Sequence, residues 1–207
     1  YTTNSLTLGG VYTGTLTVDG VSLANNASVV NLWSQATSAT SSVVFSGGAS
    51  NFTQPLDVRC TSNILVSTNV SALTTGTMIP SWFAPSTEFV GSATGLVVSL
   101  MSDSDCDRVG NVTVSPFVSV TSSNRPLVIQ AHDIELSGFV SAGSSFVRIA
   151  TCPGVTRTID VGGSGLNAGD LRLSEFELTM ISAANMTIQT SGTGSSIQVY
   201  TVLASDV

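Results

Sequence analysis

Short segments in which apolar and hydroxyl-bearing residues alternate recur along the chain, and they constrain its fold more than any other feature. Leu96–Leu100, Val112–Val114 and Ile159–Val161 are three of them. A period of two places the apolar side chains on one face of a β-strand. Many neighbouring segments lie about 10–13 residues apart, with Gly, Asn, Asp or Ser between them. This spacing predicts an all-β chain and fits a sandwich, a barrel or a solenoid equally well.

The composition agrees with strands and turns. The 207 residues include 33 Ser, 26 Thr and 19 Gly, and Lys is absent. Thr, Val and Ile favour strands, whereas Ser and Gly favour turns. Because 42% of the residues are hydrophobic, the chain can bury a core and is not expected to be disordered. We expect residues 1–207 to form a single all-β module.

Three segments stand apart from the alternating pattern or at its edge. Residues 74–95 are the least regular stretch, and we expect a lateral loop insertion there. Residues 1–18 already alternate, and they are a candidate intermolecular strand that adds to another protomer. Ser174 and Glu177 have the spacing of a capping box, which predicts one short helical turn.

The charge pattern excludes two kinds of partner. The net charge is −7, and only 9% of the residues are charged. A protein that binds nucleic acid needs clustered Lys and Arg, and anionic membrane surfaces attract such clusters too. The longest apolar runs have about five residues, whereas a membrane-spanning helix needs about 20. We expect no nucleic-acid partner and no membrane insertion.

The C-terminal third carries the most specific pattern, in which apolar strands are separated by Gly-containing turns. It resembles the repeats of filamentous-haemagglutinin-like adhesins of the two-partner-secretion type, and of giant surface proteins. The resemblance covers residues 126–200 well and residues 60–125 loosely. The residues that fall on matching positions are Asp133, Gly138, Gly162, Glu177, Thr187 and Ile188. The resemblance implies a right-handed parallel β-helix; the alternative is an Ig-like β-sandwich completed by strand donation.

These features point to an extracellular or cell-surface structural module of a fibre, pilus-like appendage or adhesin. The expected action is head-to-tail self-assembly, with identical protomers or neighbouring repeats as partners. The alternative function is a carbohydrate-binding or carbohydrate-cleaving β-helix protein. Paired carboxylates can cleave glycosidic bonds, but we interpret the candidates as outward-facing strand residues and expect no enzyme. Those candidates are Asp133, Glu135, Asp160 and Asp170. The single histidine, His132, is expected at a corner between strands.

The cysteines and the glycosylation motifs fit an oxidising compartment. Of three cysteines, two should pair and one should stay free, and the expected pair is Cys60 with Cys106. Five Asn-x-Ser/Thr motifs are candidate N-glycosylation sites if the source is eukaryotic. Their asparagines, expected at exposed positions, are Asn26, Asn51, Asn69, Asn111 and Asn185.

One acidic segment has the spacing of a Ca²⁺ loop. Asp103, Asp105 and Asp107 alternate, so their carboxylates can converge on a hard cation if the backbone curls. The EF-hand pattern requires Gly at its sixth position, where this chain has Arg108. The alternative is a solvated acidic turn. No other cofactor is expected.

Two aromatic residues of the predicted insertion are candidates for sugar binding. Trp82 and Phe83 are adjacent, and their rings could stack on sugar rings of a glycan partner. The alternative is that they plug the core or cap a loop.

Overall fold

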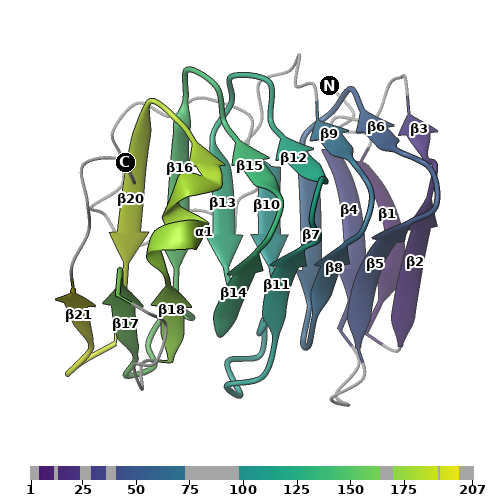
Figure 1. Cartoon of the computed structure of the whole chain (residues 1–207). Helices are drawn as coiled ribbons and strands as arrows, with labels where there is room; N and C mark the ends of the chain where they lie inside the picture. The colour runs from purple at the N-terminus through teal and green to yellow at the C-terminus, as the bar shows by residue number, and fades with distance from the viewer. Residues whose placement is uncertain are drawn as a thin grey trace.

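The computed structural model of the chain describes residues 5–11, 14–23, 29–35, 41–72, 98–163, 170–190 and 192–200. Within these ranges the chain forms 21 β-strands and one short helix, and every strand pairing is parallel (Figure 1). The predicted all-β class is confirmed. The sheets of an Ig-like sandwich are antiparallel, so the parallel pairing contradicts that alternative.

From residue 5 to residue 150, successive strands enter three sheets in turn, so that strands three apart in the chain are neighbours in a sheet. Sheet A contains β1 (Ser5–Gly10), β4 (Val29–Ser34), β7 (Leu56–Cys60), β10 (Val98–Met101), β13 (Leu127–Gln130), β16 (Phe146–Ala150) and β20 (Asn185–Gln189). Sheet B contains β2 (Thr15–Asp19), β5 (Ser42–Ser46), β8 (Ile64–Val66), β11 (Asn111–Val114) and β14 (Asp133–Leu136). Sheet C contains β3 (Ser22–Leu23), β6 (Ser50–Phe52), β9 (Val70–Ala72), β12 (Ser119–Thr121), β15 (Phe139–Ser141) and β19 (Ile181–Ser182). Later in the chain, β15 pairs with β19 and β16 with β20.

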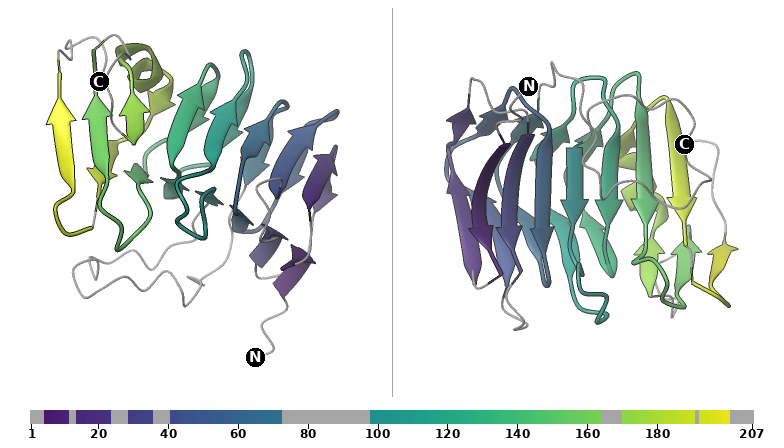
Figure 2. Two further views of the ribbon diagram at one scale, coloured as in Figure 1. Left: turned by 90° about the horizontal axis from the view of Figure 1, so that it is seen from below. Right: turned by 180° about the vertical axis from the view of Figure 1, so that it is seen from behind.

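We call one passage through sheets A, B and C a circuit; β1–β3 form the first and β13–β15 the fifth. Consecutive circuits lie side by side along one axis, as both views in Figure 2 show. The arrangement is compatible with a β-solenoid.

The order of strands changes after the fifth circuit. Sheet D contains β17 (Thr158–Val161), β18 (Leu171–Leu173) and β21 (Ser196–Val199), in the order β18, β17, β21. Because β18 also lies against β14, it occupies the place between β14 and β17, although β17 comes first in the chain. Helix α1 (Glu175–Thr179) then connects β18 to β19. With five residues, this helix, the only one in the described ranges, is far too short to cross a membrane.

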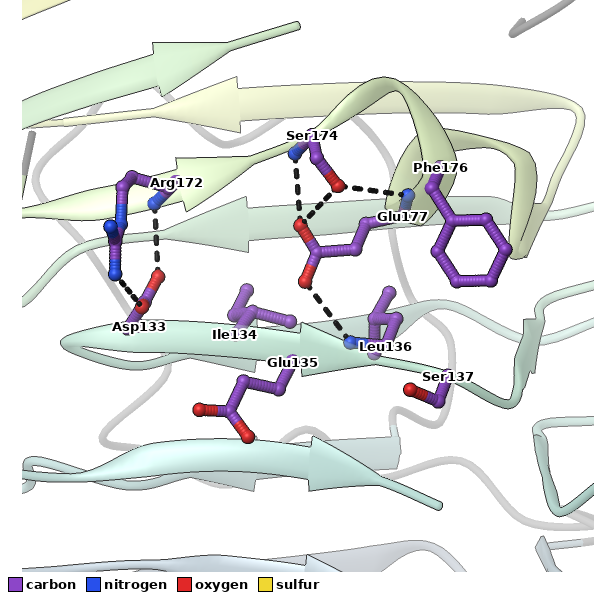
Figure 3. Close-up of a pocket in the computed structure, with 9 residues that line it drawn as sticks. All are labelled: Asp133, Ile134, Glu135, Leu136, Ser137, Arg172, Ser174, Phe176 and Glu177. Carbon is purple, nitrogen blue, oxygen red and sulfur yellow. Dashed lines mark hydrogen bonds and ion pairs between the residues drawn. The ribbon is translucent and has the colours of Figure 1, made fainter. Parts of the chain in front are cut away.

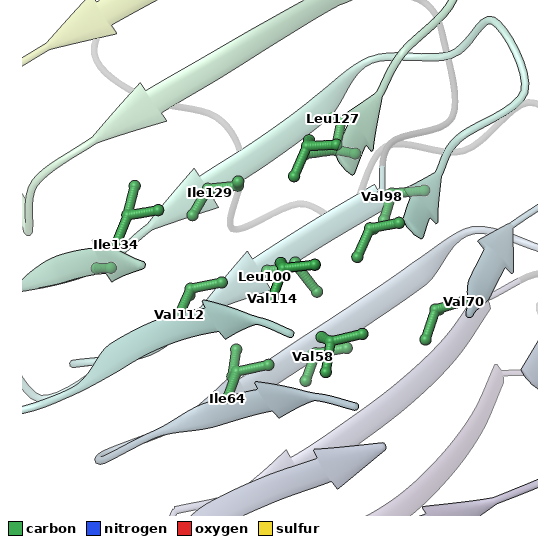
Figure 4. Packing of buried hydrophobic residues seen from close by; sticks show 14 of the residues in the cluster. Val58, Ile64, Val70, Val98, Leu100, Val112, Val114, Leu127, Ile129 and Ile134 are labelled. Carbon is green, nitrogen blue, oxygen red and sulfur yellow. The ribbon is translucent and has the colours of Figure 1, made fainter. Parts of the chain in front are cut away.

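Parallel pairing in register stacks the apolar side chains of successive circuits into rows (Figure 4). One row of sheet A consists of Leu32, Val58, Leu100, Ile129 and Ile149, each at most 1% exposed. Burial of such a side chain contributes about 1.5–3 kcal/mol, so these rows stabilise the fold.

The alternating pattern predicts that the apolar residues of each segment face the core, and the structure agrees with this except at the C-terminal strands. The residues expected to be buried and found so are Ile134, Leu136, Val147, Ile149, Ile159, Val161, Leu171 and Leu173. The prediction was wrong for Ile197 and Val199, which are 43% and 69% exposed, and Ile188 is only half-buried. The reason for the exposure in β21 is that this strand has a neighbour on one side only.

Of the two segments singled out in the sequence, residues 74–95 lie outside the described structure and most of residues 1–18 lie within it. Trp82 and Phe83 belong to the predicted insertion at 74–95 and so lie outside the described residues as well. At the other segment, β1 pairs with β4 of the same chain over six residue pairs, and β2 pairs with β5. Within one chain these strands therefore form the first circuit, and the intermolecular role of residues 1–18 stays a prediction.

Candidate functional site

A groove opens where β14 and β18 face each other without a shared hydrogen-bond ladder. The two strands belong to different sheets. Side-chain carboxylates, and not backbone carbonyl groups, accept the hydrogen bonds from backbone N–H groups across the groove. The backbone N–H of Arg172 donates to Oδ1 of Asp133 at 3.0 Å, and that of Leu136 donates to Oε1 of Glu177 at 3.2 Å. The side chains therefore satisfy backbone donors that the separated strands leave without a ladder partner.

Local sequence explains how these carboxylates are positioned. Ser174 is the N-cap of α1, and Glu177 completes the predicted capping box: its Oε2 accepts from the Ser174 backbone N–H at 2.9 Å and from the Ser174 hydroxyl at 2.8 Å. Asp133 is fixed in turn by Arg172, whose Nη2 lies 3.2 Å from Oδ2. Both oxygens of Asp133 and both of Glu177 thus accept hydrogen bonds.

The groove has a volume of about 450 Å³ and is open to solvent. In Figure 3 the Phe176 ring stands at the end of the groove where Leu136 and Ser137 lie, and Arg172 stands at the other. The residues that line it are Asp133, Ile134, Glu135, Leu136, Ser137, Arg172, Ser174, Phe176 and Glu177. This surface offers hydrogen-bond acceptors, hydroxyls, one guanidinium and one exposed aromatic ring.

The structure brings together only two of the four carboxylates weighed for catalysis. Asp133 and Glu135 share the groove, and Glu135 is exposed, with Thr113 Oγ1 donating to its Oε2 at 3.3 Å. Asp160 is buried in β17, while Asp170 accepts from the Thr158 backbone N–H at 2.9 Å. The groove therefore offers recognition by hydrogen bonds, with Asp133 already bound to Arg172.

Sequence reasoning found part of this groove and missed part of it. The capping-box spacing identified Glu177 as a helix cap, but no local signal placed it against Leu136, which is 41 residues away. Arg172 and Phe176 were missed because their position depends on β18 lying next to β14.

A buried ion pair occupies the corner between sheets A and B. The Arg157 and Asp103 side chains are both 1% exposed, and Nη2 of Arg157 lies 3.0 Å from Oδ2 of Asp103. Nη1 of Arg157 lies 3.6 Å from Oδ1 of Asp170 and 3.3 Å from Nδ1 of His132. This network joins the fourth circuit to strands that come later in the chain, and it places His132 at a corner as expected.

Burial and charge shift two pKa values in this network. Burial raises the pKa of Asp103 to about 6, an effect larger than the lowering by Arg157. Burial also lowers the pKa of His132, and the neighbouring Arg157 cation lowers it further. A neutral imidazole with its proton on Nε2 can accept the hydrogen bond from Arg157 on Nδ1, so the geometry agrees with the direction of the shift.

The three predicted calcium ligands do lie together. Asp103 is buried, Asp105 and Asp107 are exposed, and one carboxylate oxygen from each lies within 4.8 Å of the others. However, Asp103 accepts from Arg157 through Oδ2 and from the backbone N–H of Arg108 through Oδ1, at 3.1 Å. A cation would have to share Asp103 with the guanidinium, so this donor set does not favour calcium.

The disulfide differs from the expected pair. Cys106 is bonded to Cys152, and the buried Cys60 is free. One bridge and one free thiol were expected, but the pairing of Cys60 with Cys106 was wrong. Cys60 is fully buried at the end of β7, where its Sγ lies 3.4 Å from the carbonyl oxygen of Ser62. Cys106, at a positive φ of 65°, lies in a loop after β10, and the bridge joins it to the residue that follows β16 by two positions.

Burial raises the pKa of the Cys60 thiol to about 12. The nucleophilic form of cysteine is the thiolate, so this free thiol is expected to be unreactive in the folded protein.

Four of the five glycosylation motifs lie in the described structure, and Asn26 lies outside it. Asn51, Asn69 and Asn185 are exposed, whereas Asn111 is half-buried. Nδ2 of Asn111, the atom that would carry a glycan, contacts Oε1 of Glu135 at 3.4 Å. Asn51, Asn69 and Asn185 are therefore the better glycosylation candidates.

Trp33 of β4 is a further aromatic candidate for sugar stacking, but its ring already contacts other side chains. Its Nε1 donates to Oδ2 of Asp57 at 3.3 Å, and the Arg59 guanidinium lies 5.2 Å from the ring centroid. Burial raises the pKa of Asp57 more than Arg59 lowers it. Trp33 therefore belongs to a structural cluster.

Comparison of the chain with protein-family models, with curated proteins and with solved structures finds no match.

Proposed function

We propose that this chain is a right-handed parallel β-helix that serves as an extracellular structural module and assembles head to tail. Support for the handedness comes from the general rule that crossover connections between parallel strands are right-handed in about 98% of cases. The Cys106–Cys152 bridge and the exposed glycosylation motifs support an oxidising, extracellular environment. The fibre or adhesin role follows the resemblance of residues 126–200.

The observation that carries the proposal is the exposure of apolar row residues at both ends of the stack. Val199 of β21 is 69% exposed although it aligns with Val161, which is 6% exposed. At the other end Leu8 of β1 is 40% exposed and aligns with Leu32, which is 1% exposed. Covering these ends would remove apolar surface from water, which is favourable by roughly 25 cal/mol per Å².

The free edge of β21 also exposes backbone N–H groups that can pair with another strand. In a parallel pair, alternate residues of a strand bond to opposite neighbours. Ser196 and Tyr200 donate their backbone N–H groups to Arg157 and Val161, so the N–H groups of Ile197 and Val199 face the free edge of β21. A strand of another subunit can pair there. In the proposed assembly, residues 1–18 provide the complementary edge.

The two edges are different, which determines the kind of assembly. A contact between unlike surfaces is heterologous, and it produces a filament unless its rotation closes a ring. The partner in this proposal is an identical copy or the neighbouring repeat of a longer chain.

Val199→Asp tests the proposal because Val199 is already exposed, so the variant should fold. We expect the wild-type chain to form filaments with rising concentration in sedimentation velocity and electron microscopy, and Val199→Asp to stay monomeric with an unchanged Tm. Val109→Asp is the matched control, because Val109 is 41% exposed but lies in the acidic loop. A wild-type chain that stays monomeric, or a Val199→Asp variant that still polymerises, would refute assembly through β21.

A further inference from the structure

Phe117 is both strained and exposed. Ser115, Pro116, Phe117 and Val118 form a β-turn, in which the Val118 N–H lies 3.3 Å from the Ser115 carbonyl oxygen. Phe117 follows proline and has a φ of +63°, the position at which a type II turn prefers Gly or Asn. Its side chain is 99% exposed, so the ring gains nothing from packing within the chain.

A bulky residue at positive φ is disfavoured by its Cβ, and exposure of an aromatic ring to water is unfavourable as well. Gly at this position would avoid both costs. Residues held in such conformations cluster at functional sites, so the turn indicates that the Phe117 ring has a role outside the fold.

Two further exposed phenylalanines lie at the equivalent places farther along the chain, one directly after a connection and one within it. Phe139 follows the connection from β14 to β15, and Phe176 lies in α1, which connects β18 to β19; they are 55% and 56% exposed. The Phe139 N–H donates to the Val118 carbonyl oxygen at 2.8 Å, so the first two connections are in contact. We call Phe117, Phe139 and Phe176 the phenylalanine ridge.

The ridge repeats along the stacking axis. Paired strands of successive circuits are about 4.8 Å apart, and β12 pairs with β15, so Phe117 and Phe139 lie on adjacent circuits. Phe176 lines the groove from the side of α1. The equivalent connections of the first three circuits, residues 20–21, 47–49 and 67–69, contain no aromatic residue. Within the described connections, the ridge is therefore confined to the fourth circuit, the fifth circuit and α1, and the last two of these border the groove between β14 and β18.

The ridge and the groove together define the chemistry of a ligand. Phe176 belongs to both, so a ligand on the ridge would also reach Glu135 and Ser137, which are exposed. The exposed carboxylate of Glu135 and the net charge of −7 disfavour polyanions such as nucleic acids and acidic glycans. A ligand that contacts all three rings would be a polymer with a repeating apolar face. To bind in the groove as well, it would carry hydroxyl groups that can donate hydrogen bonds to carboxylates.

We propose that the phenylalanine ridge and the groove beside it bind a linear, uncharged polysaccharide, with sugar rings stacked on the phenylalanines and hydroxyl groups bonded to Glu135. This site is separate from the strand edges of the proposed assembly and does not depend on that assembly.

Affinity electrophoresis in gels that contain hydroxyethyl cellulose, xylan or mannan tests the proposal. We expect at least one polymer to retard the wild-type chain, and the loss of each ring to weaken binding by about three- to tenfold. Phe117→Gly is the sharpest variant, because it should weaken binding while raising Tm by about 2–4 °C through relief of the positive φ. A structural role for Phe117 would instead lower Tm.

Val109→Ser is the matched control, since it removes an exposed apolar side chain that belongs neither to the ridge nor to the lining of the groove, and its binding should equal that of the wild type. Phe139→Ser provides a second variant should Phe117→Gly fold differently. Absence of retardation by all three polymers, or unchanged binding in both variants, would overturn the proposal. Ridge variants that lose polymerisation but bind no glycan would identify the ridge as a protein contact and overturn it as well. Val199→Asp should bind the polysaccharide as the wild type does, so a failure of the assembly proposal can be distinguished from a failure of the glycan-binding proposal.

Discussion

Replacement of Arg157 by Met is expected to destabilise the protein by an amount that increases with pH. Arg157 is 1% exposed, and its removal leaves the Asp103 carboxyl without its guanidinium partner in a buried position. Ionisation of a buried, unpaired carboxyl is strongly unfavourable. In the folded variant Asp103 should therefore stay protonated at pH values where it ionises in the wild type.

The magnitude follows from the pKa of Asp103, about 6 in the folded wild type against 3.8 for the unfolded chain. The folded wild type gains about 1.4 kcal/mol per pH unit above 6 from ionisation of Asp103, and the variant does not. The loss of unfolding free energy due to Asp103 should thus be near zero at pH 5, about 1.4 kcal/mol at pH 7 and about 2.7 kcal/mol at pH 8. The loss of the Arg157 contacts with Asp170 and His132 lowers the unfolding free energy further, by an amount that is nearly constant above pH 7, where His132 is neutral.

Urea unfolding of the wild type and of Arg157→Met at several pH values between 7 and 8.5 measures how the difference in their unfolding free energies increases with pH. The double variant Arg157→Met/Asp103→Asn is the control, because it removes the titrating group; its destabilisation should not depend on pH in that range. A pH-independent loss of stability in Arg157→Met itself would refute the account of Asp103 as a buried carboxylate that Arg157 keeps ionised.

Ile159→Ala should lower the free energy of unfolding by about 2–5 kcal/mol, because Ile159 is 0% exposed between Leu171 and Ile197; Ile197→Ala, at 43% exposure, should cost clearly less in the same urea titration. Thiol titration should detect no reactive cysteine in the native protein and one per chain in denaturant, since Cys60 is buried with a pKa raised to about 12, and three thiols per chain would contradict the disulfide. Wild-type stability should fall as pH rises from about 4 towards 6 through Asp103, whose folded pKa is raised; the lowered pKa of His132 acts in the opposite direction below about 6.5. Asp103→Asn should therefore lose the contribution of Asp103 and keep those of His132 and of Asp57, whose pKa is also raised. If the source is eukaryotic, deglycosylation should reduce the intact mass through Asn51, Asn69 or Asn185, and an unchanged mass would argue against glycosylation.

Much of the site was beyond prediction because it depends on contacts between distant residues. Asp133 and Glu135 were recognised as residues of one strand face, and the structure places both in the groove. Arg172 contacts Asp133 from 39 residues away and Glu177 contacts Leu136 from 41 residues away, and only the position of β18 brings them there. The calcium candidates illustrate the same limit, since their spacing was evident whereas the engagement of Asp103 by Arg157, 54 residues away, was not.

Features that depend on neighbouring residues could be predicted from the sequence. Alternation at a period of two specified which side chain of each strand turns inward, as at Val112 and Val114, because successive side chains of a strand point to opposite faces. The spacing of Ser174 and Glu177 specified the short helix in the same way, through hydrogen bonds within a single turn.

The choice of neighbouring strands, in contrast, is a property of the whole fold. The order β18, β17, β21 reverses chain order in one place, and an alternating strand fits any parallel neighbour of the same pattern equally well. The groove, the Cys106–Cys152 bridge and the exposed β21 all follow from that arrangement. Local sequence does not encode it, because the choice depends on packing and hydrogen bonds between segments that are far apart in the chain.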